Sequence, residues 1–212
     1  MEPRIIVFGA GGHAVSVLDA LRASGINPAF ILDDAPEKKG TQLLGTAVRG
    51  SAQELPPAEL RECTILVAIA VNAARQRVVG SLTERVAGFA GVRHPTATIS
   101  PFAMVDPTAQ VMARVVVNAG ARVEAHAVLN TGAIIEHDAH VGAFTHIGPG
   151  AVLAGAVVIE EGAFVAAGAT VCPFVRLGRG SVLGAGGVAL QDVPADWVAV
   201  GVPARKLRKV SA

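Results

Sequence analysis

Residues 129–153 read LNTGAIIEHDAHVGAFTHIGPGAVL, and every sixth position of this stretch carries an aliphatic side chain. The spacing continues without a miss from Ile99 to Leu183, which makes fifteen hexads, and a small or compact residue stands four places after each aliphatic one. An α-helix repeats every 3.6 residues and a simple strand every 2, so neither predicts a strict period of six. The pattern predicts an all-β domain, a parallel β-helix.

In a parallel β-helix, the compact residue and the next aliphatic residue lie two apart on one short strand and both point inward. Three hexads close one triangular coil, so fifteen hexads predict five coils in which residues eighteen apart lie directly above one another. Because no coil buries its inward side chains alone, the stack supplies the core and both ends need a cap. We expect residues 93–188 to form this domain and residues 189–212, with Trp197, to cover its last coil.

The first 92 residues follow a different pattern. Apolar runs at 4–8, 29–32 and 64–70 predict buried strands, and the stretches 13–23 and 73–86 predict helices. Strands and helices in alternation indicate a small, Rossmann-like α/β domain over residues 1–92. Such a domain has a parallel sheet and binds ligands at the carboxyl ends of its strands.

Composition excludes several classes of protein. A formal net charge of +1 and only 4% aromatic residues argue against nucleic acid as a partner. The stretch 139–159 lacks Asp, Glu, Lys and Arg, but its glycines and Pro149 stay in the hexad register, so we expect a solenoid wall and no membrane insertion. Cys63 and Cys172 lack metal or redox spacing, and the amino terminus lacks the apolar core of a signal peptide. We therefore expect a cytoplasmic protein with reduced thiols.

A glycine turn follows the first predicted strand. Its pattern Gly9-x-Gly11-x-x-Ala14 fits the dinucleotide-binding fingerprint, yet about ninety residues make only half of that fold, so a mononucleotide is the more economical ligand. Glycines let backbone N–H groups approach a phosphate at a helix start. We expect the residues at the carboxyl ends of the strands to bind the substrate: Gly11, Gly12, His13, Asp33, Asp34 and Asn72. The alternative is a purely structural turn in a capping domain.

Histidines at outward or corner positions of the predicted solenoid are the candidates for chemistry: His126, His137, His140 and His146. A solvated side chain is the alternative for each of them, and we prefer it for His126. His137 differs because it stands between Glu136 and Asp138, either of which could orient the imidazole of a general base. Gly155 follows eighteen residues later, so we expect it one coil above His137, with room and a backbone N–H for a reacting carbonyl.

Several motifs together make the chain similar to a known family. It resembles the NeuD/PglD-type sugar O- and N-acyltransferases of the sialic acid and bacillosamine pathways over nearly its whole length. The residues that carry the resemblance are Gly9-Ala10-Gly11-Gly12-His13, Leu32-Asp33-Asp34, Asn130-Thr131, Ile135-Glu136-His137-Asp138, Thr145-His146 and Gly201-Val202-Pro203-Ala204. The resemblance implies a left-handed β-helix and a homotrimer that binds acetyl-coenzyme A (acetyl-CoA) in active sites between subunits.

The resemblance also implies roles for single residues. It makes His137 the general base and puts His146 near the acetyl thioester, and it assigns the glycine turn with His13, Asp33 and Asp34 to the nucleotide sugar. Gly155, Ala167 and Gly186 match the coenzyme site, although relatives often have glycine in place of Ala167. Relatives often carry Glu in place of Asp138, whose shorter side chain would have to reach the imidazole. We expect Lys206, in a basic tail, to attract the coenzyme phosphates; the alternative is a solvated terminus.

These expectations lead to one predicted function. We predict direct acetyl transfer from acetyl-CoA to the amino group of a UDP- or GDP-linked amino-deoxy sugar, with His137 as general base and neither a metal nor a cysteine nucleophile. Three alternatives stay open: a sialic acid O-acetyltransferase, a zinc lyase of the carbonic anhydrase type, and a non-catalytic regulator that binds a nucleotide sugar. The sequence does not distinguish uridine from guanosine, or an amine acceptor from a hydroxyl.

Overall fold

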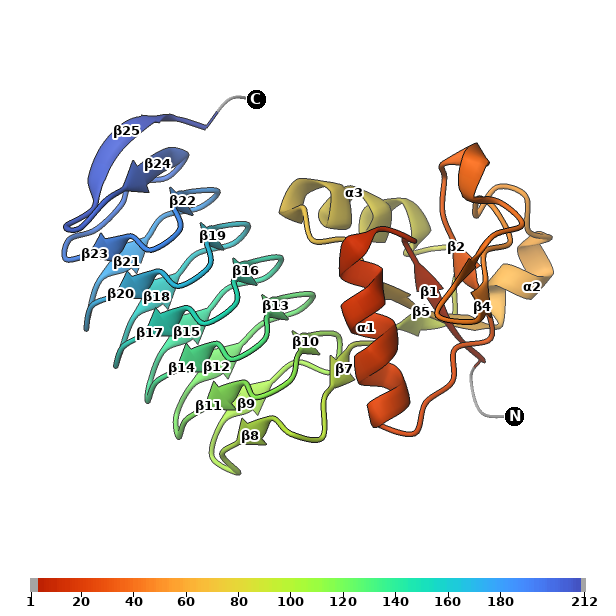
Figure 1. Ribbon diagram of the computed structural model, residues 1–212, viewed down its shortest axis with the longest axis horizontal. Coiled ribbons are helices and arrows are strands. Elements are labelled where there is room, and N and C mark those ends of the chain that lie inside the picture. The colour runs from red at the N-terminus through yellow and green to blue at the C-terminus, as the bar shows by residue number, and fades with distance from the viewer. Residues whose placement is uncertain (1–3, 211–212) are drawn as a thin grey trace. The chain divides into compact units, whose positions relative to one another are not determined.

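The computed structural model describes residues 4–210 and divides them into two compact units, one up to Pro95 and one from Thr96 onward (Figure 1). The predicted domain boundary at 92/93 lies three residues before this division. None of the helices among residues 4–210 is long and apolar enough to cross a membrane.

The N-terminal unit is built on a parallel sheet with the strand order β2-β1-β5-β6. The bounds of its elements are β1 (Arg4–Phe8), α1 (Gly12–Ala23), β2 (Ile31–Leu32), a 3-10 turn (Pro36–Lys38), β3 (Gln42–Leu43), β4 (Thr46–Ala47), α2 (Pro57–Arg61), β5 (Cys63–Val67), α3 (Asn72–Leu82), β6 (Gly88–Phe89) and β7 (Val92–Arg93). The predicted strands and helices are confirmed; the β3–β4 hairpin, α2 and β6 are additional. Phe8 and Val67 end adjacent parallel strands, so the turns after β1 and β5 meet at one edge of the sheet.

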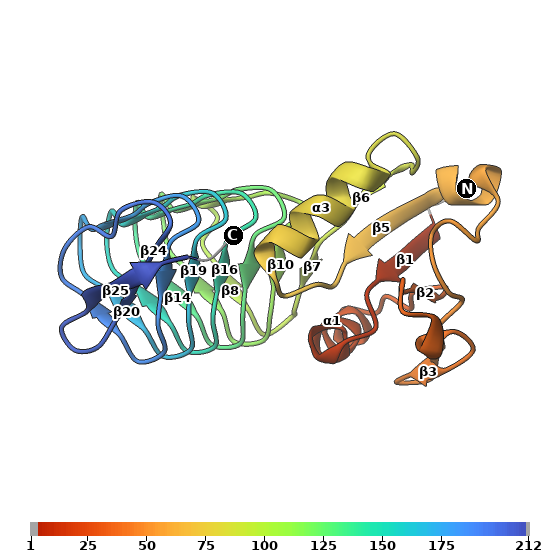
Figure 2. The same cartoon turned by 90° about the horizontal axis from the view of Figure 1, so that it is seen from above.

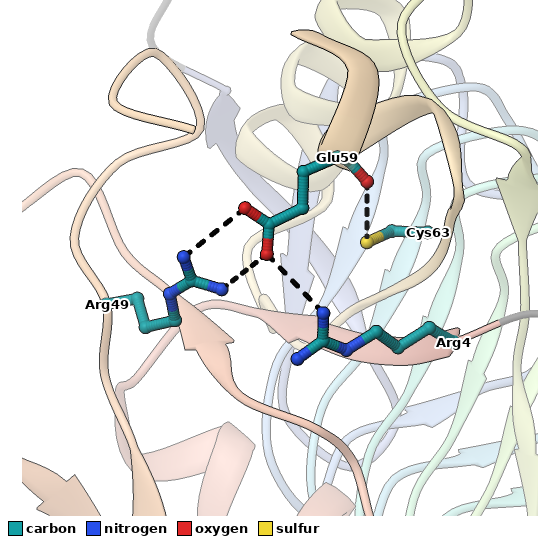
Figure 3. Close-up of polar contacts among 4 residues, drawn as sticks. All are labelled: Arg4, Arg49, Glu59 and Cys63. Carbon is teal, nitrogen blue, oxygen red and sulfur yellow. Dashed lines mark hydrogen bonds and ion pairs between the residues drawn. The ribbon is translucent and has the colours of Figure 1, made fainter. Parts of the chain in front are cut away.

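A charged cluster ties the start of this sheet to α2 (Figure 3). The Glu59 carboxylate accepts hydrogen bonds from Arg49, at 2.6 and 3.3 Å, and from Arg4, at 3.4 Å. The bond from Arg49 lowers the pKa of Glu59. The Cys63 thiol donates to the Glu59 carbonyl at 3.3 Å, and burial raises the pKa of this thiol, which keeps it protonated. Cys63 therefore belongs to the packing of this unit.

The second unit is a parallel β-helix whose strands, two residues long up to β23, form three walls (Figures 1 and 2). The first wall contains β8 (Thr98–Ile99), β11 (Val116–Val117), β14 (Ile134–Ile135), β17 (Val152–Leu153), β20 (Thr170–Val171) and β23 (Val188–Ala189). The second contains β9 (Met104–Val105), β12 (Arg122–Val123), β15 (His140–Val141), β18 (Val158–Ile159) and β21 (Arg176–Leu177). The third includes β10 (Gln110–Val111), β13 (Val128–Leu129), β16 (His146–Ile147), β19 (Phe164–Val165), β22 (Val182–Leu183), β24 (Trp197–Val200) and β25 (Arg205–Lys209).

The predicted register is confirmed. Ile135 pairs with Val117 below and Leu153 above, and each pair is eighteen residues apart. The aliphatic and compact positions form one continuous core, in which Ala133 and Ile135 are fully buried. The all-β parallel β-helix after a small α/β domain is therefore confirmed, while left-handed winding stays a prediction of the resemblance.

The residues after the fifteenth hexad add further strands to the β-helix. After the fifteen predicted hexads, β23 pairs with β20 and β24 pairs in parallel with β22, so the chain begins a sixth, irregular turn. Val193 and Ala199 continue the core, but they stand sixteen and not eighteen residues after their partners Leu177 and Leu183. The chain then reverses, and β25 pairs antiparallel with β24. Trp197, half-buried on β24, packs against the core at this end.

Candidate active site

The glycine turn of the N-terminal unit exposes backbone at the start of α1. Gly9 has a φ of +107°, and a Cβ added there would stand 3.0 Å from the Ala68 carbonyl oxygen, so the close approach of the two turns requires glycine. A Cβ added at Gly11 or Gly12 would meet nothing within 4 Å. The turn therefore presents open backbone at a helix N-terminus, where N–H groups suit a phosphate.

A cavity of about 360 Å³ lies beside this turn. Residues from the turns after β1, β2 and β5 line it, and they include five of the six predicted substrate residues: Gly11, Gly12, His13, Asp33 and Asp34. Lys38 and residues 68–71 complete much of the wall. The sequence-based placement of these five residues around one site is therefore consistent with the structure of the unit.

Asp33 lines this cavity, and both of its carboxylate oxygens accept hydrogen bonds from the same unit. One carboxylate oxygen accepts from the Ala10 amide at 2.6 Å and from Lys38 Nζ at 2.9 Å, and the other accepts from the Ala35 amide at 2.9 Å. Burial alone would raise the pKa of Asp33, but the hydrogen bonds from Lys38, Ala35 and Ala10 lower it overall. The Asp33 carboxylate therefore orients the glycine turn and Lys38, and its expected contact with the substrate stays a prediction.

Asn72 does not line the cavity. Its side-chain oxygen accepts a hydrogen bond from Arg75 at 2.9 Å. Arg75 is fully buried and also donates to the Ile69 and Ala70 carbonyls, at 2.8 and 3.2 Å. Burial lowers the pKa of Arg75 to about 10, which leaves it charged at neutral pH. Arg75 thus fixes the turn after β5 that forms one side of the cavity.

His137 and Asp138 form a hydrogen-bonded pair at the turn between the first and second walls. His137 Nδ1 lies 2.9 Å from Asp138 Oδ2, so the aspartate reaches the imidazole. Both side chains are exposed, at 65% and 68%, so the pair contributes little to folding stability and is accessible to a ligand. Glu136, the other acidic neighbour, accepts a hydrogen bond from Asn118 at 2.9 Å instead.

Gly155 lies directly above His137, as the spacing predicted. A Cβ added at Gly155 would stand 2.6 Å from His137 Nε2 and 2.7 Å from Cε1, so the imidazole rests on the glycine backbone. The Gly155 carbonyl accepts from Phe174, while the Gly155 N–H makes no backbone hydrogen bond among residues 4–210. The turn therefore brings together an imidazole, a carboxylate and an amide.

The other histidines have different surroundings. His146 on β16 is only 7% exposed and packs against the Phe164 ring. Its Nε2 atom lies 3.1 Å from Asn130 Nδ2. His140 Nε2 lies 2.7 Å from a Glu124 carboxylate oxygen. We expected His126 to be merely solvated, and this was wrong: it is half-buried and stacks on the Phe144 ring at 5.0 Å.

The predicted coenzyme residues lie at separate places on the β-helix. Ala167 and Gly186 are exposed at turns that join the third wall to the first, in adjacent coils, and the Gly186 amide donates to the Ala167 carbonyl at 2.9 Å. Lys206 is exposed on β25, and its ammonium lies 5.4 Å from the centre of the Trp197 ring. Gly155 stands at the turn of the first and second walls. Among residues 4–210 there is no group of three His, Cys, Asp or Glu side chains that could hold a metal ion.

Three residues that shape the two sites were not predicted from the sequence. Lys38 lies five residues after Asp33 with no motif around it, and Arg75 has no recognisable signal. No sequence motif marks Gly120 either, yet a Cβ added there would overlap the Asp138 carboxylate, one coil above. The period of eighteen could have identified Gly120, because it stands eighteen residues before Asp138.

The chain is similar to known acetyltransferases. The family model of the PglD N-terminal domain matches residues 4–82. One similar structure is perosamine N-acetyltransferase from Caulobacter crescentus, in a variant with a histidine replaced by asparagine and in complex with CoA and GDP-perosamine. It is 35% identical to this chain with a TM-score of 0.91, and the match covers 99% of each chain. The acetyltransferase domain of PglB from Neisseria gonorrhoeae, in complex with acetyl coenzyme A, is 32% identical with a TM-score of 0.86, over 98% of this chain and 100% of that one.

Identity above 30% over nearly the full length, together with the shared fold, shows the family. The match extends over both the α/β unit and the β-helix. The chain therefore belongs to the hexapeptide-repeat acetyltransferase family that includes perosamine N-acetyltransferase and the PglB acetyltransferase domain.

Proposed function

We propose that this protein transfers an acetyl group from acetyl-CoA to the amino group of a nucleotide-linked amino-deoxy sugar, with His137 as general base. The observation that carries the proposal is the exposed His137–Asp138 pair resting on Gly155. The named substrate and bound coenzymes of the similar structures support the same reaction class.

The hydrogen bond between His137 and Asp138 selects the nitrogen that acts. An ionised carboxylate only accepts hydrogen bonds, so the proton of a neutral imidazole belongs on Nδ1. The lone pair then lies on Nε2, the ring nitrogen nearest Gly155. Asp138 also stabilises the imidazolium that forms when Nε2 takes a proton.

The proposed reaction is a single acyl transfer. As the sugar amine attacks the thioester carbon, a C–N bond forms and the amine gives a proton to His137 Nε2. Negative charge develops on the carbonyl oxygen, and the Gly155 N–H is our candidate to donate to it. Collapse of this intermediate breaks the C–S bond; the coenzyme leaves as a thiolate, which recovers a proton to give the free thiol.

We assign the nucleotide part of the acceptor to the cavity of the N-terminal unit. The open backbone at Gly11 and Gly12 suits a diphosphate, and Lys38 adds a positive charge. His13 and Asp34 line the same cavity, and we assign both to contacts with the nucleotide sugar. Whether the base is guanine or uracil is an outcome of the experiment below.

We further propose that the active protein is a homotrimer with coenzyme sites between subunits. Gly155 stands on one edge of the three-sided column and Ala167 with Gly186 on another, so two copies side by side could supply both sets to one ligand. The outward positions of the first wall are mostly β-branched and half-buried, which suits a contact with another copy: Val116, Ile134, Val152, Thr170 and Val188. We also propose that the protein acts in the cytoplasm, whose reducing conditions keep thiols such as Cys63 and Cys172 free.

A thiol-release assay tests the proposal. Purified protein is given acetyl-CoA with GDP-perosamine, UDP-linked 4-amino sugars or free sialic acid, and free thiol is measured against time. We expect release with at least one nucleotide-linked amino sugar and its loss in His137→Asn. Release with sialic acid alone would establish the O-acetyltransferase, and ligand binding without release from any acceptor would establish the non-catalytic regulator.

A further inference from the structure

The turn that carries His137 and Asp138 recurs in successive coils, and a different residue stands at the position of Asp138 in each of them. Asp138 has a φ of 59°, in the left-handed region, and so do Ala156 at 56° and Phe174 at 64° in the next two coils. Gly120 occupies this place one coil below Asp138, with a φ of +77°. Because three non-glycine residues adopt this conformation at the same corner, the backbone alone does not require glycine at position 120.

The Asp138 side chain accounts for the glycine. A Cβ added at Gly120 would overlap Asp138 Oδ1 and would stand 3.3 Å from Cγ, so the carboxylate lies where a larger residue would have its side chain. The other oxygen, Oδ2, lies 2.9 Å from His137 Nδ1. One oxygen is therefore seated on Gly120 while the other holds the imidazole.

We propose that Gly120 is a positioning residue whose missing side chain lets Asp138 hold His137 in its active orientation. The pair is thus bracketed by two glycines, with Gly120 one coil below the carboxylate and Gly155 one coil above the imidazole. A methyl group at position 120 forces the Asp138 carboxylate away and frees the imidazole to rotate. Its effect on turnover rests on the proposed function of His137.

A double-mutant cycle tests this role. The four proteins are wild type, Gly120→Ala, Asp138→Ala and the double variant. We expect Gly120→Ala to lower kcat by on the order of 10-fold, about as much as Asp138→Ala, with the KM of both substrates unchanged. In the Asp138→Ala background the added methyl group meets no carboxylate, so the double variant should be no slower than Asp138→Ala alone.

Gly162→Ala is the matched control. Gly162 has a φ of +70° at another corner, and a Cβ added there would meet nothing within 4 Å, so the variant has the same backbone strain without the clash. It should keep the wild-type kcat. Unchanged kcat in Gly120→Ala, or independent and multiplying losses in the double variant, would overturn the proposal.

A crystal structure of Gly120→Ala separates this proposal from the proposed function. We expect the separation of His137 Nδ1 and the Asp138 carboxylate to exceed hydrogen-bond range, whatever the enzyme's acceptor. If wild type releases no thiol with any acceptor but the separation increases, the function fails and the role of Gly120 stands. If the 2.9 Å contact persists in Gly120→Ala, the role of Gly120 fails.

Discussion

The imidazole of His137 rests on the backbone of Gly155, one coil above it, so closely that a Cβ at position 155 would stand 2.6 Å from Nε2. We expect Gly155→Ala to lower kcat on the order of 100-fold, because the methyl group displaces the nitrogen that takes the proton. Ala119 stands eighteen residues before His137, so alanine itself is compatible with this corner. Thermal unfolding should change little, and a kcat within threefold of wild type would contradict the proposed site.

Lys38 should bind the charged part of the nucleotide sugar. We expect Lys38→Met to weaken nucleotide-sugar binding about 10-fold, equivalent to about 1.4 kcal/mol, and to reduce its sensitivity to salt. Isothermal titration calorimetry at two salt concentrations checks both effects. Lys39→Met is the control, because Lys39 pairs with Glu54 at 3.0 Å and does not line the cavity. Equal affinities of the two variants for the nucleotide sugar would contradict a role of Lys38 in binding it.

Arg75 should act on the cavity through the turn after β5. In Arg75→Met the Ile69 and Ala70 carbonyls lose a donor, at a cost of about 1–3 kcal/mol for a buried group left unpaired. We expect a lower melting temperature and weaker nucleotide binding, with the KM for acetyl-CoA unchanged. Arg77→Met, on the exposed face of the same helix, is the control. A variant that is destabilised but binds the nucleotide normally would show that Arg75 serves stability alone.

Asp33 should make the stability of the protein depend on pH. Its pKa in the folded state lies below the ordinary 3.8, so its ionised form stabilises the fold above pH 3.8 and this contribution is lost as the pH falls through the folded-state pKa. Urea unfolding should therefore show Asp33→Asn less stable than wild type at pH 7, with the difference shrinking below about pH 4. Asp19→Asn, on the exposed face of α1, serves as the control. A difference that is constant across this range would contradict this role of the Asp33 carboxylate.

The β-helix was predictable because its core repeats. Each coil buries the same two kinds of side chain, so the period of six in the sequence gives the strands, the eighteen-residue register and the position of Gly155 above His137. The sixth turn was not predictable in this way, because Val193 and Ala199 pair with Leu177 and Leu183 sixteen residues earlier, which breaks the eighteen-residue register. The antiparallel return of β25 depends on pairing with β24, which leaves no periodic signal.

The N-terminal site was predictable in location but less so in detail. Parallel strands bring their carboxyl ends together, which placed Gly11, His13 and Asp33 around one cavity. Individual partners depend on side-chain reach: Asp33 is occupied by Lys38, and Asn72 by Arg75. The two residues of such a pair have no fixed spacing along the chain, so no sequence motif predicts the contact.

The most direct measurement is the single-turnover rate of thiol release in His137→Asn, a variant of similar shape without a basic ring nitrogen, with saturating acetyl-CoA and the best nucleotide-linked amino sugar. We predict a rate at least 100-fold below wild type, with dissociation constants for both ligands within threefold of the wild-type values. A rate within tenfold of wild type, with both ligands bound, would contradict the assignment of His137 as the base.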